Sequence, residues 1–137
     1  MDMDTAVIQI DGLADIVRAR QSVRDTAREL GLTLADQTRI ATSVSELTRN
    51  IIQYAGKGKV AITGEKNKGL ARIRVVVSDN GPGIADIENA MEDGFSTSGG
   101  LGMGLPGVKR LVEDFEINSR SGQGTTVSIA VSRRLWV

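Results

Sequence analysis

A glutamate and an asparagine stand four residues apart in a segment whose apolar spacing predicts a helix. Glu46 and Asn50 therefore project from one face of that helix. A carboxylate in this place can serve as a base, and an amide oxygen is a ligand that suits the hard cation Mg²⁺. A solvated polar face with a local side-chain pair also explains the two residues. The helix alone leaves both interpretations open.

A second carboxylate follows directly after a predicted strand, at Asp79 in the run Asp-Asn-Gly-Pro-Gly. A carboxylate at the end of a strand can accept a hydrogen bond from an exocyclic amine such as that of adenine. Gly81 and Gly83 would let a flat ring approach the backbone closely. An ordinary polar turn explains the same residues, so this motif by itself also leaves two interpretations.

A glycine-rich segment runs into a predicted helix near Leu105. It offers hydroxyl groups and backbone N–H groups just before a helix N-terminus, which suits phosphate oxygens. Five glycines in nine residues, from Gly99 to Gly107, do not define one backbone conformation, so we expect a mobile lid. Gly102-x-Gly104-x-x-Gly107 matches a dinucleotide-binding fingerprint, but no strand precedes it, and this context excludes that interpretation.

The composition removes several classes of chemistry. The chain has 137 residues, 40% hydrophobic and 25% charged, which predicts one soluble domain over residues 1–137. It has no cysteine and no histidine, which excludes thiol catalysis, a histidine base, a phosphohistidine and nearly every transition-metal site. Lys+Arg 17 balance Asp+Glu 17, so no nucleic-acid partner is expected. Short apolar stretches and an acidic start predict no membrane partner and a cytoplasmic location.

Hydrophobic periodicity and turn residues predict an α+β fold. We expect a two-layer sandwich in which helices cover one face of a mixed, mostly antiparallel sheet. The predicted strands are residues 6–10, 59–64, 70–78, 115–119 and 125–131. The predicted helices are residues 13–30, 34–54, 86–91 and 105–114.

The two long helices are expected to contribute the apolar side of the helix layer. Gly31 is a plausible C-cap for the first, and the second is predicted to start after Thr33 with a capping-box-like pair to Asp36. The apolar residues at helical spacing in the first helix are Leu13, Ile16, Val17, Val23, Ala27 and Leu30. The expected buried stripe of the second is Ile40, Val44, Leu47 and Ile51.

The three motifs together resemble a known superfamily, the ATP-binding domain shared by gyrase, Hsp90, histidine kinases and MutL (GHKL). The resemblance covers essentially the whole chain and implies the Bergerat ATP-binding fold. Without further domains or a phosphorylated-histidine helix, the chain is most similar to the small free-standing branch of anti-sigma-factor serine kinases and stressosome switch kinases. The motifs, in order, are Glu46-x-x-x-Asn50, Asp79-x-Gly81-x-Gly83 and Gly100-Leu101-Gly102-Met103-Gly104.

The resemblance implies a role for each matched residue. Glu46 is expected to be the base that takes or orients the proton of a serine hydroxyl, and Asn50 to coordinate Mg²⁺ on the ATP phosphates. Asp79 is expected to receive the adenine amino group, with Gly81 and Gly83 shaping the adenine side. The other expected ATP-binding residues are Ser96, Thr97, Ser98, Gly99, Gly100, Leu101, Gly102, Met103, Gly104, Leu105, Thr125 and Thr126.

The resemblance also implies an ATP-dependent serine/threonine-protein kinase that acts in partner switching. The expected substrates are STAS-domain stressosome proteins, an RsbS-like antagonist and an RsbR-like scaffold, and the expected effector after release is an RsbU-like phosphatase. The alternative is an anti-sigma factor kinase that sequesters a sigma factor and phosphorylates its antagonist. A nucleotide-gated binding module is a third class, and the retained Glu46 argues against it.

Overall fold

Five strands form one sheet in a computed structural model, which describes residues 2–84, 91 and 104–135. Their order across the sheet is β1-β2-β3-β5-β4, and each neighbouring pair is antiparallel, where the sequence also allowed a mixed sheet. The strands are β1 (Asp2–Ile10), β2 (Gly58–Asn67), β3 (Leu70–Asp79), β4 (Asp114–Ser119) and β5 (Thr125–Arg134).

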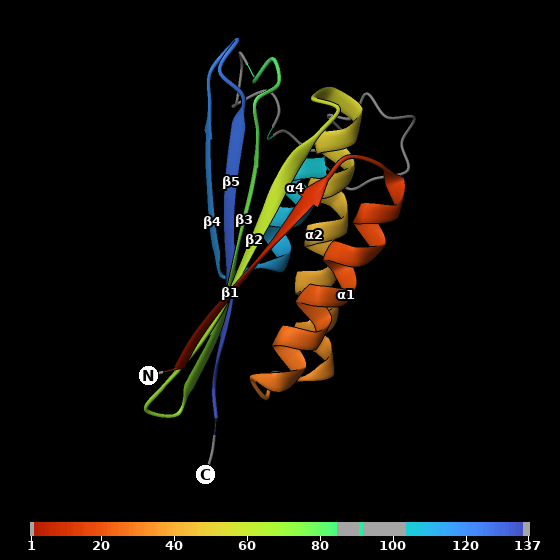
Figure 1. Ribbon diagram of the computed structural model, residues 1–137. Helices are drawn as coiled ribbons and strands as arrows, with labels where there is room; N and C mark the ends of the chain where they lie inside the picture. The colour runs from red at the N-terminus through yellow and green to blue at the C-terminus, as the bar shows by residue number, and fades with distance from the viewer. Residues whose placement is uncertain (1, 85–90, 92–103, 136–137) are drawn as a thin grey trace.

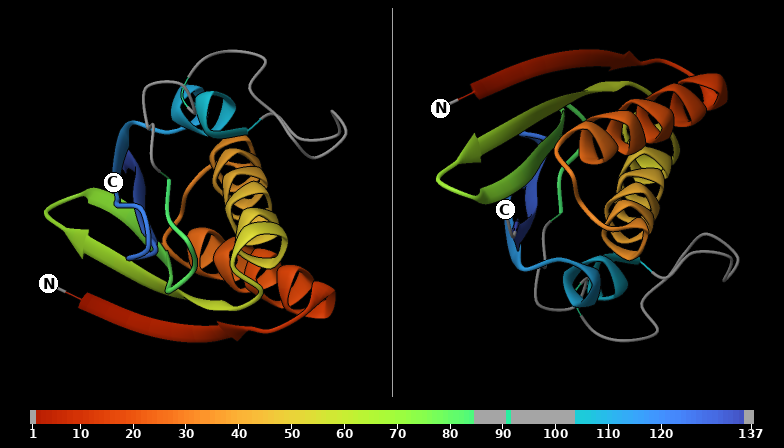
Figure 2. Two further views of the ribbon diagram at one scale, coloured as in Figure 1. Left: turned by 90° about the horizontal axis from the view of Figure 1, so that it is seen from above. Right: turned by 90° about the horizontal axis from the view of Figure 1, so that it is seen from below.

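Helices cover one face of this sheet (Figure 1). They are α1 (Leu13–Glu29), α2 (Leu34–Tyr54) and α4 (Gly104–Leu111). Seen from above and from below, α2 lies between α1 and α4, and the helices form a second layer beside the strands (Figure 2). The predicted two-layer α+β sandwich is therefore confirmed. Among the helices that the structure describes, none combines the length and apolar character needed to cross a membrane.

The core lies between the two layers, and α2 contributes as the sequence predicts. The spacing of three and four residues brings one apolar stripe of this helix against the sheet. Its members are nearly or completely buried: Ile40, Val44, Leu47 and Ile51.

Helix α1 departs from the prediction on one side. Ile16, Val23 and Ala27 are buried, but Leu13 is 71% exposed and Val17 is 54% exposed. Helical spacing identifies apolar positions but not their neighbours, and among the described elements α1 packs mainly against α2 and the strands β1 and β2. Leu13 and Val17 lie 60–100° around the helix from Ile16, at about 100° per residue, and face away from these neighbours.

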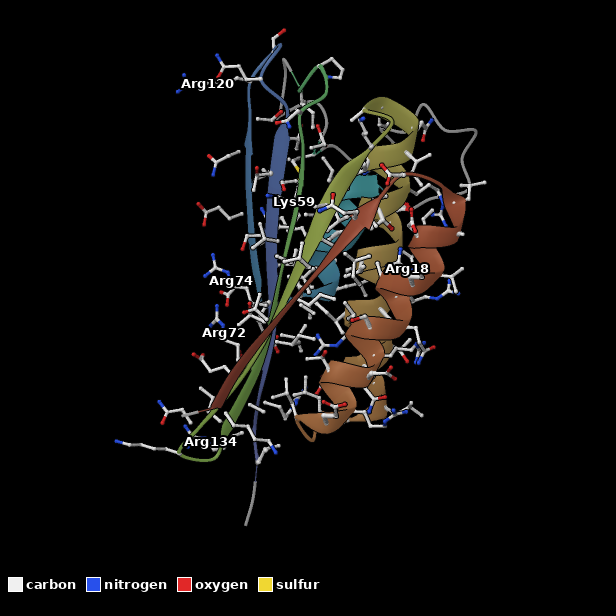
Figure 3. All side chains as sticks on the ribbon, viewed as in Figure 1. Arg18, Lys59, Arg72, Arg74, Arg120 and Arg134 are labelled. Carbon is white, nitrogen blue, oxygen red and sulfur yellow. The ribbon has the colours of Figure 1, made fainter. Side chains whose placement is uncertain are left out.

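The strands show the alternation expected of a sheet with one covered face. On β3, Ile73 and Val75 are fully buried under the helices. Arg72 and Arg74 come from the same strand and lie on the side away from the helices (Figure 3). Arg72 pairs there with Asp114 of β4 at 3.1 Å.

Four predicted boundaries are wrong by three or more residues. Strand β1 begins at Asp2 rather than at residue 6, because residues 2–5 pair with residues 63–66 of the longer β2, and β5 continues to Arg134, which pairs with Leu70, rather than ending at residue 131.

The ends of β2 and α4 have local reasons. The hairpin between β2 and β3 turns at Lys68-Gly69, both with positive φ as in a type I′ turn, so residues 65–67 continue the strand. Helix α4 ends at Leu111 because the N–H of Glu113 already bonds to the carbonyl oxygen of Ala130, which starts the pairing of β4 with β5. The predicted helix 86–91, except for its last residue, lies outside the described residues.

Candidate functional site

Glu46 lies on the face of α2 that meets α4, and its side chain is almost completely buried, with 5% exposed. Its Oε2 accepts a hydrogen bond from Arg49 Nη1 at 2.8 Å. Its Oε1 accepts one from the backbone N–H of Gly104 at 3.2 Å. Both oxygens of the predicted base are therefore bound, one to a cation and one to a peptide group. Arg49 is not among the predicted site residues, although its i,i+3 spacing to Glu46 is visible in the sequence.

Gly104 is the first residue of α4, and it carries one of the N–H groups that a helix cannot satisfy internally. The N-terminus of a helix bears partial positive charge, so a carboxylate is a favourable partner. Leu105, the next residue, is buried and belongs to the core. The structure therefore brings Glu46 of the first motif into contact with the helix that follows the glycine-rich segment.

Asp79 ends β3 beside the C-terminal end of α2. Its Oδ1 accepts a hydrogen bond from the backbone N–H of Gly81 at 2.9 Å, which is the polar turn that the sequence allowed. Gly81 lies so close to Ala55, the C-cap of α2, that a Cβ at position 81 would be 2.5 Å from the Ala55 Cβ. The Asp79 loop is thus held against the helix that carries Glu46 and Asn50.

On its other side the Asp79 loop rests on the turn between β4 and β5. A Cβ on Gly83 would lie 2.0 Å from the carbonyl oxygen of Arg120, and a Cβ on Gly124 would lie 2.1 Å from that of Asp79. Both glycines have positive φ, +76° and +79°. Gly83 was predicted to allow the approach of a flat ring, and in the structure its lack of a side chain is required for packing of the chain on itself. Gly124 is not among the predicted site residues.

Ser119 forms hydrogen bonds with both of these loops, and it was not predicted as a site residue. Its hydroxyl accepts a hydrogen bond from the N–H of Ile84 at 2.7 Å and donates one to the carbonyl oxygen of Gly124 at 3.0 Å. The hydroxyl of Thr125 lies 2.7 Å from the same oxygen. A serine at the end of a strand has no pattern in sequence that predicts such a three-way contact.

The remaining predicted ATP-binding residues are Asn50, Thr125 and Thr126, which the structure describes, and residues 96–103, which it does not. Asn50 is half-buried on α2, and Thr125 is the residue opposite Asp79 in the β3–β5 register. Thr126 lies opposite Ser78. Because side chains alternate along a strand, Thr126 lies on the opposite face of the sheet from Thr125 and Asp79. Residues 96–103 lie outside the described part of the chain, so their predicted contacts stay predictions.

The donor set suits Mg²⁺ held mainly by a nucleotide. Within the described residues, no group of three His, Cys, Asp or Glu side chains could hold a metal ion. Protein-bound Mg²⁺ commonly keeps several waters and takes its other ligands from substrate phosphates and one or two protein oxygens. One amide oxygen from Asn50 is compatible with that arrangement.

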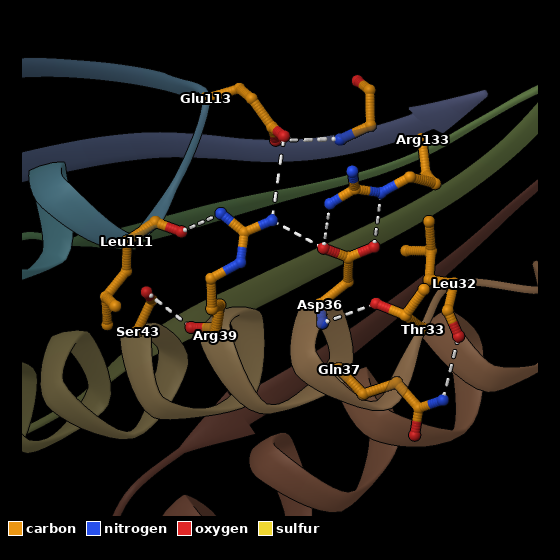
Figure 4. Close-up of polar contacts among 10 residues, drawn as sticks. Leu32, Thr33, Asp36, Gln37, Arg39, Ser43, Leu111, Glu113 and Arg133 are labelled. Carbon is orange, nitrogen blue, oxygen red and sulfur yellow. Dashed lines mark hydrogen bonds and ion pairs between the residues drawn. The ribbon is translucent and has the colours of Figure 1, made fainter.

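An ion-pair cluster around the buried Asp36 lies at the opposite end of α2 (Figure 4). Asp36 has no exposed surface, and Arg133 of β5 donates to both of its oxygens, at 2.9 and 2.6 Å. Arg39 adds a third contact at 2.6 Å. The hydrogen bonds from Arg133, followed by that from Arg39, hold the pKa of Asp36 well below its ordinary value. Thr33 caps α2 at the Asp36 N–H, but the Asp36 side chain serves the arginines and completes no capping box.

Residues 35–135 match the family model described as histidine kinase-, DNA gyrase B-, and HSP90-like ATPase. The match covers well over half of the chain and includes all elements that form the site. The chain therefore belongs to this family of ATPases.

Two curated proteins and one solved structure refine the comparison. Serine/threonine-protein kinase RsbT of Bacillus subtilis (strain 168) is 52% identical over 124 residues, which cover 90% of this chain and 93% of RsbT. Anti-sigma F factor of Caldanaerobacter subterraneus subsp. tengcongensis is 34% identical over 113 residues, 80% of this chain and 79% of that protein. The structure of the RsbU and RsbW domains of Rv1364c from Mycobacterium tuberculosis superposes with a TM-score of 0.61. It covers 96% of this chain and 33% of that one at 20% identity, and supports the fold alone.

The family match and the similarity to RsbT thus define an ATP-dependent protein kinase. Within that class the chain is RsbT-like, a serine/threonine-protein kinase of the partner-switching type.

Proposed function

We propose that this kinase transfers the γ-phosphate of ATP to a serine or threonine of STAS-domain stressosome proteins, an RsbS-like antagonist and an RsbR-like scaffold. The contact between Glu46 and Gly104 carries the proposal, because it brings the expected base to the first residue of α4. This helix follows the glycine-rich segment that is expected to bind phosphate. The 52% identity to RsbT supports the kinase class. The STAS substrates follow from the resemblance of the motifs.

Each residue of the proposed site contacts a different part of Mg-ATP. Asp79 receives the adenine amino group, and Thr125 shares a bridging water with it, a proposal supported by their pairing across β3 and β5. Asn50 supplies an amide oxygen to Mg²⁺, which when bound neutralises charge on the phosphates. The backbone N–H groups at the start of α4, with the preceding residues 96–103, receive phosphate oxygens.

In the proposed step, the substrate hydroxyl oxygen forms a bond to the γ-phosphorus. The bond from that phosphorus to the β-phosphate oxygen breaks, and ADP leaves. Glu46 takes the hydroxyl proton, and positioning with charge stabilisation provides most of the rate. To accept the proton, Glu46 must free one oxygen, and we assign Oε1, because its contact with Gly104 is the longer of its two hydrogen bonds.

The proposed switch follows from the chemistry of the product. A phosphate added to a closely packed interface introduces like-charge repulsion and a desolvation cost, so the phosphorylated scaffold releases the kinase. The released kinase, acting as one domain over residues 1–137, then binds and activates a partner such as an RsbU-like phosphatase. The proposed place of action is the cytoplasm, where ATP is available.

A second candidate function is an anti-sigma factor kinase. The 34% identity to an anti-sigma F factor over most of both chains favours it. In that case the output would be sequestration of a sigma factor, and phosphorylation would reset an antagonist.

A phosphotransfer assay with Mg-ATP separates the two candidates. The purified chain is mixed with an RsbS-like STAS protein and, separately, with a sigma factor from the same genome, and intact mass reports phosphate. Transfer to the STAS protein without sigma binding supports the proposal. Stable sigma binding selects the second candidate, and the absence of both transfer and sigma binding, with ATP still bound, contradicts both.

A further inference from the structure

Helix α4 is held at both ends by side chains of α2. Glu46 accepts the N–H of Gly104 at its first residue, and Arg39 Nη1 donates to the carbonyl oxygen of Leu111 at its last, at 3.0 Å. Arg39 and Glu46 are seven positions apart on α2, about two helical turns and about 10 Å along the axis. The eight residues of α4 span about 12 Å, so the two contacts match its length and set it antiparallel to α2.

The two side chains also have the charges that a helix dipole favours. A carboxylate at a helix N-terminus and a cation at its C-terminus are both stabilising. Glu46 lies at the positive end of α4 and Arg39 at the negative end. The contacts therefore fix both the position and the direction of this short helix.

Arg39 is itself held in place more firmly than a surface arginine (Figure 4). Its Nη2 donates to Asp36 Oδ1 at 2.6 Å and lies 3.8 Å from Glu113 Oε1. Asp36 is buried and bound to Arg133 of β5 through both oxygens. The guanidinium that binds α4 is thus oriented by Asp36 of its own helix, and Asp36 is in turn held by Arg133 of β5.

We propose that Arg39 is a positioning residue for the nucleotide site. The inference rests on the proposed function, since Gly104 connects α4 to residues 96–103, the segment proposed to bind phosphate. By holding the C-terminal end of α4, Arg39 keeps Gly104 in reach of Glu46 at the other end. Arg39 lies two turns from Glu46 and acts on the nucleotide through α4.

The first test measures α4 directly in the full chain. Hydrogen exchange of the peptide covering residues 104–111 is followed in wild type, Arg39→Gln and Arg28→Gln. Arg28 also pairs with an aspartate at i−3, but on α1 and away from α4, so it is the matched control. We expect exchange in α4 to rise roughly tenfold in Arg39→Gln alone, with α1 unchanged. Unchanged exchange in α4, or an equal rise throughout the chain, overturns the proposal.

The second test measures the consequence for the nucleotide. Arg39→Gln is expected to raise KM for ATP about fivefold and to leave kcat within about twofold, because the side chain does not touch reacting groups. Arg39→Lys keeps a cation at the end of α4 and is expected to restore part of the loss. A fall in kcat with unchanged KM, or no rescue by lysine, contradicts the assigned role. If the wild type bound no ATP, the proposed function would fail, while the exchange experiment would still decide the position of α4.

Discussion

Glu46 accepts a hydrogen bond from the backbone N–H of Gly104 at 3.2 Å, although the two residues are 58 positions apart in sequence. The same carboxylate binds Arg49 at 2.8 Å. The predicted base is therefore also the hydrogen-bond acceptor for the first backbone N–H group of α4. Replacing it with alanine would remove both functions at once, so a variant that keeps an acceptor oxygen is needed to separate them.

Glu46→Gln is expected to abolish most phosphotransfer while ATP binding is retained. Glutamine keeps a carbonyl oxygen for the N–H of Gly104, but it cannot take a proton at neutral pH. We expect kcat to fall by about 10²–10⁴-fold, the usual contribution of a positioned base. The affinity for Mg-ATP should stay within about threefold, since the acceptor at the start of α4 remains. Single-turnover transfer and isothermal titration measure the two quantities.

Glu46→Ala completes this comparison. It is expected to lose transfer and to retain measurable nucleotide binding that is about fivefold weaker than in Glu46→Gln, with faster hydrogen exchange in α4, because only alanine removes the acceptor for the N–H of Gly104. A wild-type rate of transfer in either variant would show that Glu46 is not the base.

Asp79→Asn is expected to weaken ATP binding without unfolding the chain. Asparagine can still accept the hydrogen bond from Gly81 through its one oxygen, so the turn survives. The second acceptor and the negative charge are lost, and a charge-assisted hydrogen bond of about 2 kcal/mol corresponds to roughly 30-fold in Kd. The control is Asp114→Asn, a carboxylate of β4 paired with Arg72. Equal Kd values for the two variants would remove Asp79 from the adenine site.

Local periodicity predicted the parts of the site that lie on one element. The four-residue spacing of Glu46 and Asn50 placed both on one face of α2, and the alternating strand residues gave the covered face of the sheet. Local patterns did not predict contacts between distant elements. The partners Arg133 and Asp36 are 97 positions apart, and no periodicity in either segment specifies the other.

The errors at the edges have the same origin. Leu13 and Val17 have helical spacing, but no described helix or strand covers their side of α1, because the arrangement of the helix layer depends on the whole chain. The early end of α4 depends on the pairing of Glu113 with Ala130, which the helical pattern up to Asp114 could not reveal.

Gly124→Ala is expected to destabilise the fold far more than Gly122→Ala. Both glycines have φ +79°, so each alanine has the same cost of a left-handed backbone, about 1 kcal/mol. At position 122 a Cβ meets nothing within 4 Å, whereas at 124 it would lie 2.1 Å from the carbonyl oxygen of Asp79. We expect Gly124→Ala to cost about 3 kcal/mol in all, measured by urea unfolding. Equal costs would mean that the Asp79 loop does not rest on this turn.

Asp36→Asn is expected to destabilise the protein at neutral pH and to lose this effect in acid. Arg133 and Arg39 hold the pKa of Asp36 below its ordinary value of 3.8, so the ionised form is favoured in the folded state. A depressed folded-state pKa gives stability that is present above the unfolded pKa and is lost as pH falls through the folded one. Asparagine cannot satisfy both arginines, and we expect a cost of about 2 kcal/mol at pH 7 by urea unfolding. The difference from wild type should shrink progressively below pH 3.8. Asp25→Asn, which alters exposed contacts with Arg28 and Gln21, should cost less than about 0.5 kcal/mol. A pH-independent difference for Asp36→Asn would assign its cost to packing rather than to charge.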